Sequence, residues 1–220
     1  TVNVGRTRAP LRRMGGDYLT LLADRRFVLS LLCIPLLAMP LMGWIALSPV
    51  LLVEDLGMST VEYGLWQLPV FGGLIAGNFA LVLLTERLAL GRSVLLGMWP
   101  IVGGLALMLG GIQFSSVPHI YMVAGMSLMA FGEGLSFAVL YRFALMASTV
   151  SKGTVSAAMS MLSMAGYALG IELFRHAYIA GGMIGFALMS LLTSLLFVLV
   201  ARPRVRHAMK LRAAPVAQAA

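Results

Sequence analysis

The sequence predicts an all-α membrane protein built as a bundle of six transmembrane helices, and three observations lead to this fold class. Hydrophobic residues make up 60% of the 220 residues and charged residues only 11%, whereas a soluble domain has about 25% charged residues. Six long apolar stretches follow one another, each long enough to cross a hydrocarbon core of about 30 Å at about 1.5 Å per helical residue. Positive charges collect in alternate segments between these stretches.

Short connections separate the six predicted spans, and two basic segments flank them. The spans run approximately over Phe27 to Val50, Tyr63 to Leu84, Val94 to Ile112, Ile120 to Met146, Thr154 to Phe174 and Met183 to Val200. The resulting division is a basic cytoplasmic connector over residues 1–26, a six-helix transmembrane bundle over 27–200 and a basic cytoplasmic tail over 201–220.

The first three spans differ in what interrupts them. The first contains Pro35 and Pro40, so we expect it to bend where each proline frees a backbone carbonyl. The second follows an acidic connection and carries Gly73 and Gly77, a four-residue spacing that lets helix backbones approach. The third follows a connection that contains two arginines.

The last three spans are marked by their ends and by small residues. The fourth ends near Arg142, the fifth begins after Lys152, and the sixth is followed by a basic segment. The fifth span carries two further pairs of small residues four apart, Ser156 with Ser160 and Gly166 with Gly170. Small pairs in spans two and five fit the equivalent middle helices of two inverted three-helix units.

The positions of the 16 Lys and Arg residues orient these spans. Fifteen lie before the first span, between spans two and three, around the turn after span four or after span six, and only Arg175 lies elsewhere. The first connection instead holds Glu54, Asp55 and Glu62. Because cytoplasmic segments carry the excess of Lys and Arg, the sequence predicts both termini and loops two and four on the cytoplasmic side.

Other functional classes lack support. The net charge of +8 comes from cations at span ends without interleaved aromatic residues, so we expect no nucleic-acid partner. Cys33 is the single cysteine, which excludes a disulfide framework and a cysteine-based metal site; we expect neither a metal nor another cofactor. The sequence contains no HExxH or GxSxG motif, and we expect no enzyme.

Short segments in all six spans together resemble a known family. The most specific are residues 151–159 (SKGTVSAAM), 44–49 (WIALSP), 62–78 and 170–177. Over roughly residues 15–200 and in the right order, the chain resembles the second half of the MdfA-type multidrug/proton antiporters. The resemblance implies one half of a major facilitator fold, helices seven to twelve, in which two six-helix bundles enclose a drug cavity near mid-membrane.

The resemblance implies substrate-binding residues in several spans. Leu41, Met42 and Ile45 match the drug-contacting face of the family's seventh helix; without the resemblance they read as packing or lipid-facing residues. Ser160 matches a cavity-facing position, although its small-residue pair explains it equally as a packing residue. Tyr141 is similarly placed but departs from a smaller aliphatic residue of the family.

Polar residues of the second span suggest a further contact. Gln67 and Asn78 lie eleven residues apart, about three helical turns, so they share one face. Polar side chains within a span face the bundle more readily than lipid. Gln67 is therefore a candidate substrate-binding residue, with bonding to a neighbouring helix as the open alternative.

Two ionisable residues of the fourth span are candidates for proton coupling or gating. Glu133 lies between two glycines near mid-span, where the family has an aliphatic residue. It is either a protonatable or cation-binding site or a neutral acid bonded to a neighbouring helix. Arg142 matches an arginine of the family near the cytoplasmic end, where its side chain can reach the interface, and we favour anchoring or gating over substrate contact.

The resemblance implies the C-terminal half of a proton-coupled multidrug efflux antiporter in the bacterial inner membrane, forming one side of the central drug cavity. The expected partners are lipophilic small-molecule drugs, protons, the lipid bilayer and a missing N-terminal six-helix half, which in the family carries the main coupling carboxylates. The start at Thr1 suits a connector within a longer protein. A self-contained six-span protein stays open, either a homodimeric half-transporter or a non-transporting partner subunit.

Overall fold

The computed structural model describes residues 23, 25–89, 91–146 and 151–217, of which residues 25, 26 and 210–217 are described by their backbone alone. The described part is helical and contains no strand. Its elements are α2 (Arg25–Pro49), the π-helix η1 (Val50–Glu54), α3 (Thr60–Thr85), α4 (Arg92–Phe114), α5 (Pro118–Met146) and α6 (Lys152–Ala217). The all-α membrane fold predicted from composition is confirmed.

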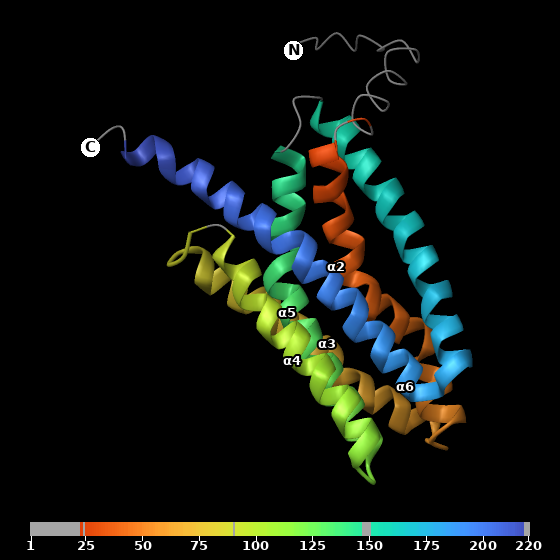
Figure 1. Cartoon of the computed structure of the whole chain (residues 1–220). Coiled ribbons are helices and arrows are strands. Elements are labelled where there is room, and N and C mark those ends of the chain that lie inside the picture. The colour runs from red at the N-terminus through yellow and green to blue at the C-terminus, as the bar shows by residue number, and fades with distance from the viewer. Residues whose placement is uncertain (1–22, 24, 90, 147–150, 218–220) are drawn as a thin grey trace, which may run out of the picture.

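Helix α6 contains two predicted spans. At about 1.5 Å per residue its 66 residues measure about 100 Å, more than three times the hydrocarbon thickness of a bilayer. The helix reverses at Gly182, where φ is 56° and ψ is −141°, and its two arms diverge from this bend (Figure 1). We call residues 152–181 the first arm and residues 183–217 the second arm. The bundle therefore has six crossings.

The helix continues beyond the predicted end of the fifth span. The sequence predicts that end near Phe174, before Arg175 and His176, and the first arm continues to Gly182. The charged side chains stay on the helix because Glu172 pairs with both: its carboxylate lies 2.5 Å from an Arg175 guanidinium nitrogen and 3.3 Å from the His176 ring. A single glycine then makes the turn.

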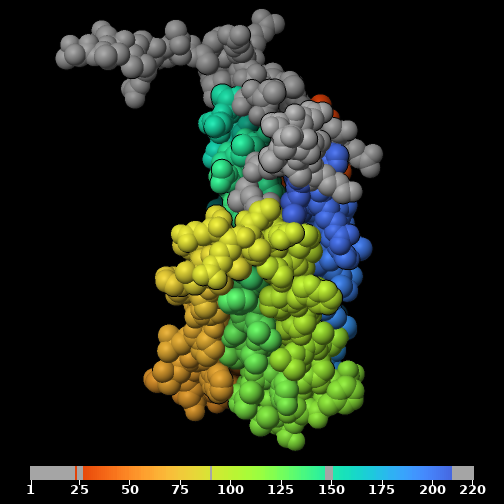
Figure 2. Space-filling model, turned by 90° about the vertical axis from the view of Figure 1, so that its left-hand side faces the viewer, coloured from red at the N-terminus to blue at the C-terminus, as the bar shows by residue number. Residues whose placement is uncertain are grey.

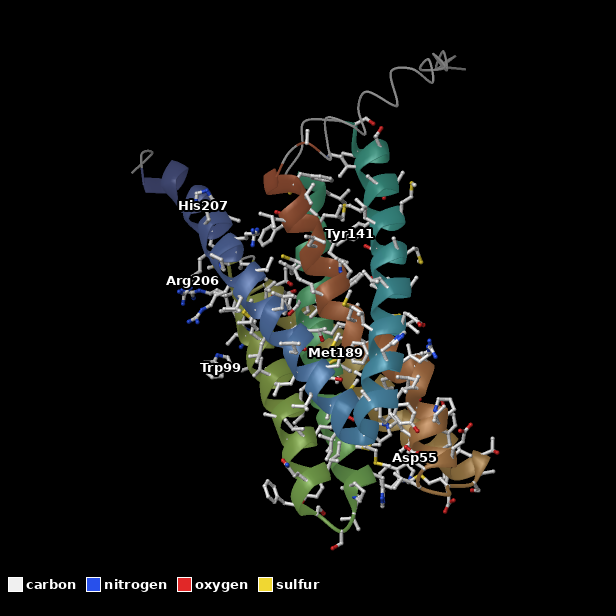
Figure 3. All side chains as sticks on the ribbon, turned by 45° about the vertical axis from the view of Figure 1, so that its right-hand side comes forward. Asp55, Trp99, Tyr141, Met189, Arg206 and His207 are labelled. Carbon is white, nitrogen blue, oxygen red and sulfur yellow. The ribbon has the colours of Figure 1, made fainter. Side chains whose placement is uncertain are left out.

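The connections alternate between the two ends of the bundle. Figure 1 shows residues 55–59, residues 115–117 and the bend of α6 at one end, and residues 86–89 and the C-terminal part of α6 toward the other. The ends differ in charge, because Asp55 lies at the first end and Arg206 and His207 on the C-terminal part (Figure 3). This alternation agrees with the predicted sequence of crossings.

Helix α5 is the central element, and glycines join it to α3 and α4. Figure 2 shows α5 between these two helices. A Cβ atom added to Gly73 or Gly77 of α3 would clash with the α5 backbone carbonyls of Ser127 and Phe131. On the α4 side, a Cβ on Gly132 would lie 2.5 Å from the Gly97 carbonyl oxygen. The small-residue pair in span two thus allows direct backbone contact, as its spacing predicts.

A second close interface joins α2 to the first arm. Cβ atoms added to Gly166 and Gly170 would lie 2.7 Å from Pro35 and 2.8 Å from Met39, respectively. Trp44 of α2 is fully buried, and its ring centroid lies 6.3 Å from that of Phe186 in the second arm. Because lipid removes the hydrophobic drive between helices, such close packing supplies much of the stability of a membrane bundle.

Large apolar side chains cover the outside of the bundle. On α3, Ile75 and Phe79 are each 69% exposed, and on α4 Trp99 is 79% exposed. Soluble monomers rarely leave such large apolar surfaces open to water. This surface suits a lipid environment and agrees with the prediction of a membrane protein.

Candidate functional site

Near the C-terminal end of α2, a stripe of residues is left uncovered by the other helices. Its members recur every three or four residues and are at least partly exposed, whereas most of α2 is buried; they are Met42, Ile45, Ala46 and Pro49. We call them the α2 stripe. Ile45 is 45% exposed, but Leu41 is only 3% exposed and packs in the core. Of the three predicted residues on this helix, two therefore lie on the open face and the third lies at its buried edge.

Ser160 lies on the exposed side of the first arm, far from the α2 stripe. The two helices run in the same direction, with Gly166 against Pro35 and Gly170 against Met39. Ser160 precedes Gly166 by six residues, and Ile45 follows Pro35 by ten. Sixteen helical residues, or about 24 Å at about 1.5 Å per residue, separate their levels along the bundle. The structure does not bring the predicted pocket residues together at one level.

A hydrogen-bonded chain fixes Gln67 beside the α2 stripe. The Trp44 indole donates to Gln67 Oε1 at 2.8 Å, and Gln67 Nε2 donates to Ser48 Oγ at 3.4 Å. Ser48 Oγ in turn lies 3.3 Å from the Tyr63 hydroxyl. Both ends of the Gln67 carboxamide are thus engaged between α2 and α3, which is the helix-bonding role left open by the sequence. Asn78 is exposed, and its side chain donates to the Leu74 carbonyl of its own helix at 2.9 Å.

A second polar group lies at the other level, where α5 meets the first arm. The Tyr141 hydroxyl lies 3.0 Å from Ser156 Oγ, and Ser160 follows Ser156 by about one turn on the same helix. Arg142, next to Tyr141, is exposed. We call these four residues the α5–α6 cluster. Figure 3 places Tyr141 toward the end of the bundle opposite Asp55.

Glu133 belongs to neither group. It is 4% exposed, and its Oε2 atom has no hydrogen-bond partner among the described residues. Burying a carboxyl group without a partner costs free energy, and the ionised form costs far more than the neutral one. Glu133 is covered by this chain alone, so in this conformation it is not part of the open face.

Sequence reasoning missed the partners that hold these groups. Trp44 and Ser48 were noted only as part of the family pattern, although a buried indole N–H needs an acceptor and so signals a polar neighbour. The bond from the Tyr178 hydroxyl to Asp55 Oδ1, at 2.9 Å, joins residues 123 positions apart. It ties the first arm to the segment after η1, and no local sequence pattern indicates such a pair.

Comparison with known proteins assigns the chain to a family of transporters. No family model matches the chain. It is 46% identical over 188 residues to the multidrug transporter MdfA of Edwardsiella piscicida, a match that covers 86% of this chain and 46% of that protein. It is 43% identical over 188 residues to MdfA of Escherichia coli O157:H7, with the same coverage.

A third relative carries a different name. The chloramphenicol resistance protein CraA of Acinetobacter baumannii is 46% identical over 172 residues, which cover 78% of this chain and 42% of that protein. The chain thus spans about half the length of the curated relatives it matches. Such identity along nearly all the helices agrees with the resemblance inferred from scattered segments. Over the region that it spans, the chain is therefore a homologue of the MdfA-type multidrug transporters.

Proposed function

We propose that this chain is the C-terminal half of a proton-coupled multidrug efflux antiporter and forms one side of its central drug cavity. The observation that carries the proposal is the match to about half of several multidrug transporters, combined with an open face on α2 that lies among otherwise buried residues. A partner bundle of the same kind would cover that face. The drug would then lie between the two bundles, as in transporters built from paired repeats.

The proposed placement is the bacterial inner membrane, with both termini cytoplasmic. In that orientation the α5–α6 cluster lies toward the cytoplasm and Asp55 toward the outside. The excess of Lys and Arg at the cytoplasmic end supports this orientation. The α2 stripe and the α5–α6 cluster would then line successive levels of one elongated cavity.

In this proposal Met42 and Ile45 supply apolar contacts for lipophilic drugs. The buried side chain of Leu41 supports the α2 wall of the cavity and does not touch the drug. Tyr141 and Ser160 supply polar contacts at the cytoplasmic level, and Arg142 anchors or gates that end. Gln67 holds the wall in place through Trp44. Alternating access follows when the two bundles rock about this cavity.

Substitutions at the two levels test the proposal. The chain is joined to the N-terminal half of the Edwardsiella piscicida relative and expressed in drug-sensitive cells. Ile45→Arg and Ser160→Trp should each change resistance to at least one drug on the order of tenfold, equivalent to about 1.4 kcal/mol. Trp99→Ala is the matched control, because Trp99 projects outward from α4 (Figure 3).

Membrane abundance is measured for every variant. The proposal requires the Trp99→Ala protein to keep the parental drug spectrum while the other two change it at equal abundance. Unchanged resistance to every tested drug in both cavity variants would remove Ile45 and Ser160 from the cavity. Resistance conferred by the 220-residue chain without any partner half would favour the homodimeric half-transporter instead.

A further inference from the structure

The side chain of Glu133 points toward a different part of the bundle from the helices that its neighbours Gly132 and Gly134 contact. A Cβ atom added to Gly132 would lie 2.5 Å from the Gly97 carbonyl oxygen of α4, and one added to Gly134 would lie 2.6 Å from the Leu74 carbonyl oxygen of α3. Consecutive helical residues point about 100° apart. Glu133 therefore points away from both α3 and α4, toward the side on which α2 and the first arm lie.

The groups around this carboxyl offer it no positive charge. Tyr167 of the first arm is within electrostatic range and is the titratable group that faces it from α6. On α2, Cys33 is the titratable residue whose side chain the structure describes, and it lies near Arg204. Those of α3 and α4 lie at helix ends, at Glu62, Tyr63 and Arg92. No charged group of the described chain stabilises an ionised Glu133.

The carboxyl is consequently neutral in this conformation. It is 4% exposed, and its Oε2 atom lacks a partner among the residues that the structure describes. A buried carboxylate without a partner would cost several kcal/mol more than the acid form. The N-terminal half is not needed to exclude water, since the helices of this chain already enclose the group.

On the side toward which Glu133 points, α5 packs against α2 and meets the first arm much less extensively. Its interfaces with α3 and α4 are backbone contacts at glycines, which cannot open without breaking close packing. Among the described residues, α5 and α6 have few contacts, and one link between α5 and the first arm is the hydrogen bond between the Tyr141 and Ser156 hydroxyls. If that link breaks and α5 separates from the first arm, water reaches Glu133.

We propose that Glu133 is a proton-binding site inside the C-terminal bundle, which holds its proton in this conformation and releases it when α5 separates from the first arm. The step is a simple proton transfer: the carboxylic acid gives its proton to water, forming a carboxylate and a hydronium ion. The carboxylate takes a proton back when α5 and the first arm come together again. The site lies outside the open face. The proposal goes beyond the proposed function and does not depend on it.

Infrared spectroscopy of the purified chain in lipid tests the site directly. The carbonyl stretch of a neutral carboxylic acid is separate from that of a carboxylate. The wild type should show a neutral-acid band at pH 7 that Glu133→Gln removes and Glu172→Gln leaves in place. Thermal unfolding of Glu133→Gln, an isosteric neutral variant, should match the wild type. Absence of the band, or its persistence in Glu133→Gln, overturns the proposal.

A cross-link tests release. In a Cys33→Ser background, Tyr141→Cys and Ser156→Cys are joined by a short bismaleimide that holds α5 against the first arm. The neutral-acid band of the unlinked protein should disappear as pH rises, and that of the linked protein should persist to higher pH. The same titration with and without the linker would show that separation of α5 from the first arm does not control the proton, and a band that persists at high pH in both would show a permanently neutral structural acid; either result overturns the release step. Because no drug or partner half is used, failure of the proposed transport function leaves this result intact.

Discussion

Gln67 shows how one carboxamide joins two helices at the residue scale. Its oxygen accepts from the Trp44 indole at 2.8 Å, and its nitrogen donates to Ser48 at 3.4 Å. Hydrogen bonds between membrane helices average about 0.6 kcal/mol and reach about 1.7 kcal/mol. The bond is therefore modest in energy, but it fixes the position of α2 against α3 beside the stripe.

The first prediction concerns this bond. Trp44→Phe and Gln67→Leu, separately and together, should give a coupling free energy of about 0.6 to 1.7 kcal/mol in a double-mutant cycle. Unfolding in mixed detergent micelles supplies the four free energies. Asn78→Leu, combined with Trp44→Phe, is the control pair and should show no coupling, because Asn78 bonds within its own helix. A coupling of zero for Gln67 would mean that the indole and carboxamide do not interact.

The sequence predicts which side chains are unusual but not what they touch. An acidic residue between two glycines identifies Glu133, and a polar residue within a span identifies Gln67. What each side chain touches depends on how its helix is rotated about its own axis. Because apolar residues surround these helices almost evenly, the hydrophobic pattern does not define that rotation. For the same reason, Leu41 and Ile45 share a face by spacing, yet one is 3% and the other 45% exposed.

At the scale of the elements, glycines determine which helices touch. The sequence predicts each span from its apolar length, and the glycine pairs correctly indicate close approaches in spans two and five, whereas Ser160 of the Ser156–Ser160 pair is exposed. Their partners could not be predicted, because the pattern carries no information on the opposite helix. Gly77 meets α5, whereas Gly170 meets Met39 of α2.

The second prediction compares two adjacent glycines of α3. Gly73→Leu places side-chain atoms against the Ser127 carbonyl of α5, whereas nothing lies within 4 Å of a Cβ added to Gly72. Overpacking of this kind costs about 1–3 kcal/mol. Gly73→Leu should therefore lower the thermal unfolding temperature in detergent, and Gly72→Leu should leave it unchanged or raise it. Equal effects would show that α3 and α5 do not meet at this glycine.

The third prediction concerns the reversal in α6. Gly182 has a backbone conformation that residues with a side chain rarely adopt, and Gly181 does not. A residue held in such a conformation costs about 1–3 kcal/mol. Gly182→Val should destabilise the protein by about that amount, with Gly181→Val as the matched control. If both valine variants unfold at the wild-type temperature, the chain does not turn at Gly182.

The sequence could not predict this turn from hydropathy. The apolar stretch of the fifth span ends near Phe174, whereas Arg175 and His176 remain on the helix surface beside Glu172. Beyond them the apolar character resumes almost at once. A tight reversal that uses one glycine leaves little polar sequence to mark it.

For the whole molecule, the distribution of Lys and Arg predicts which end of the bundle faces the cytoplasm. This orientation is the fourth prediction. Single cysteines replace Asp55, Arg87 or Lys152 in a Cys33→Ser background and are labelled in intact cells with a membrane-impermeant maleimide. Asp55→Cys should react from outside, whereas Arg87→Cys and Lys152→Cys should react only after the membrane is opened. External labelling of Lys152→Cys would contradict the proposed topology.

The central claim for the whole molecule is that one bundle supplies half of a drug cavity and requires a second bundle for transport. Alternating access needs two bundles that move about a site between them. The most direct measurement is drug-driven proton movement in liposomes, recorded for the purified 220-residue chain and for the same chain joined to the N-terminal half of the Edwardsiella piscicida relative. The account predicts proton movement on drug addition from the joined protein and none from the chain alone. Equal proton movement from the chain alone would contradict it.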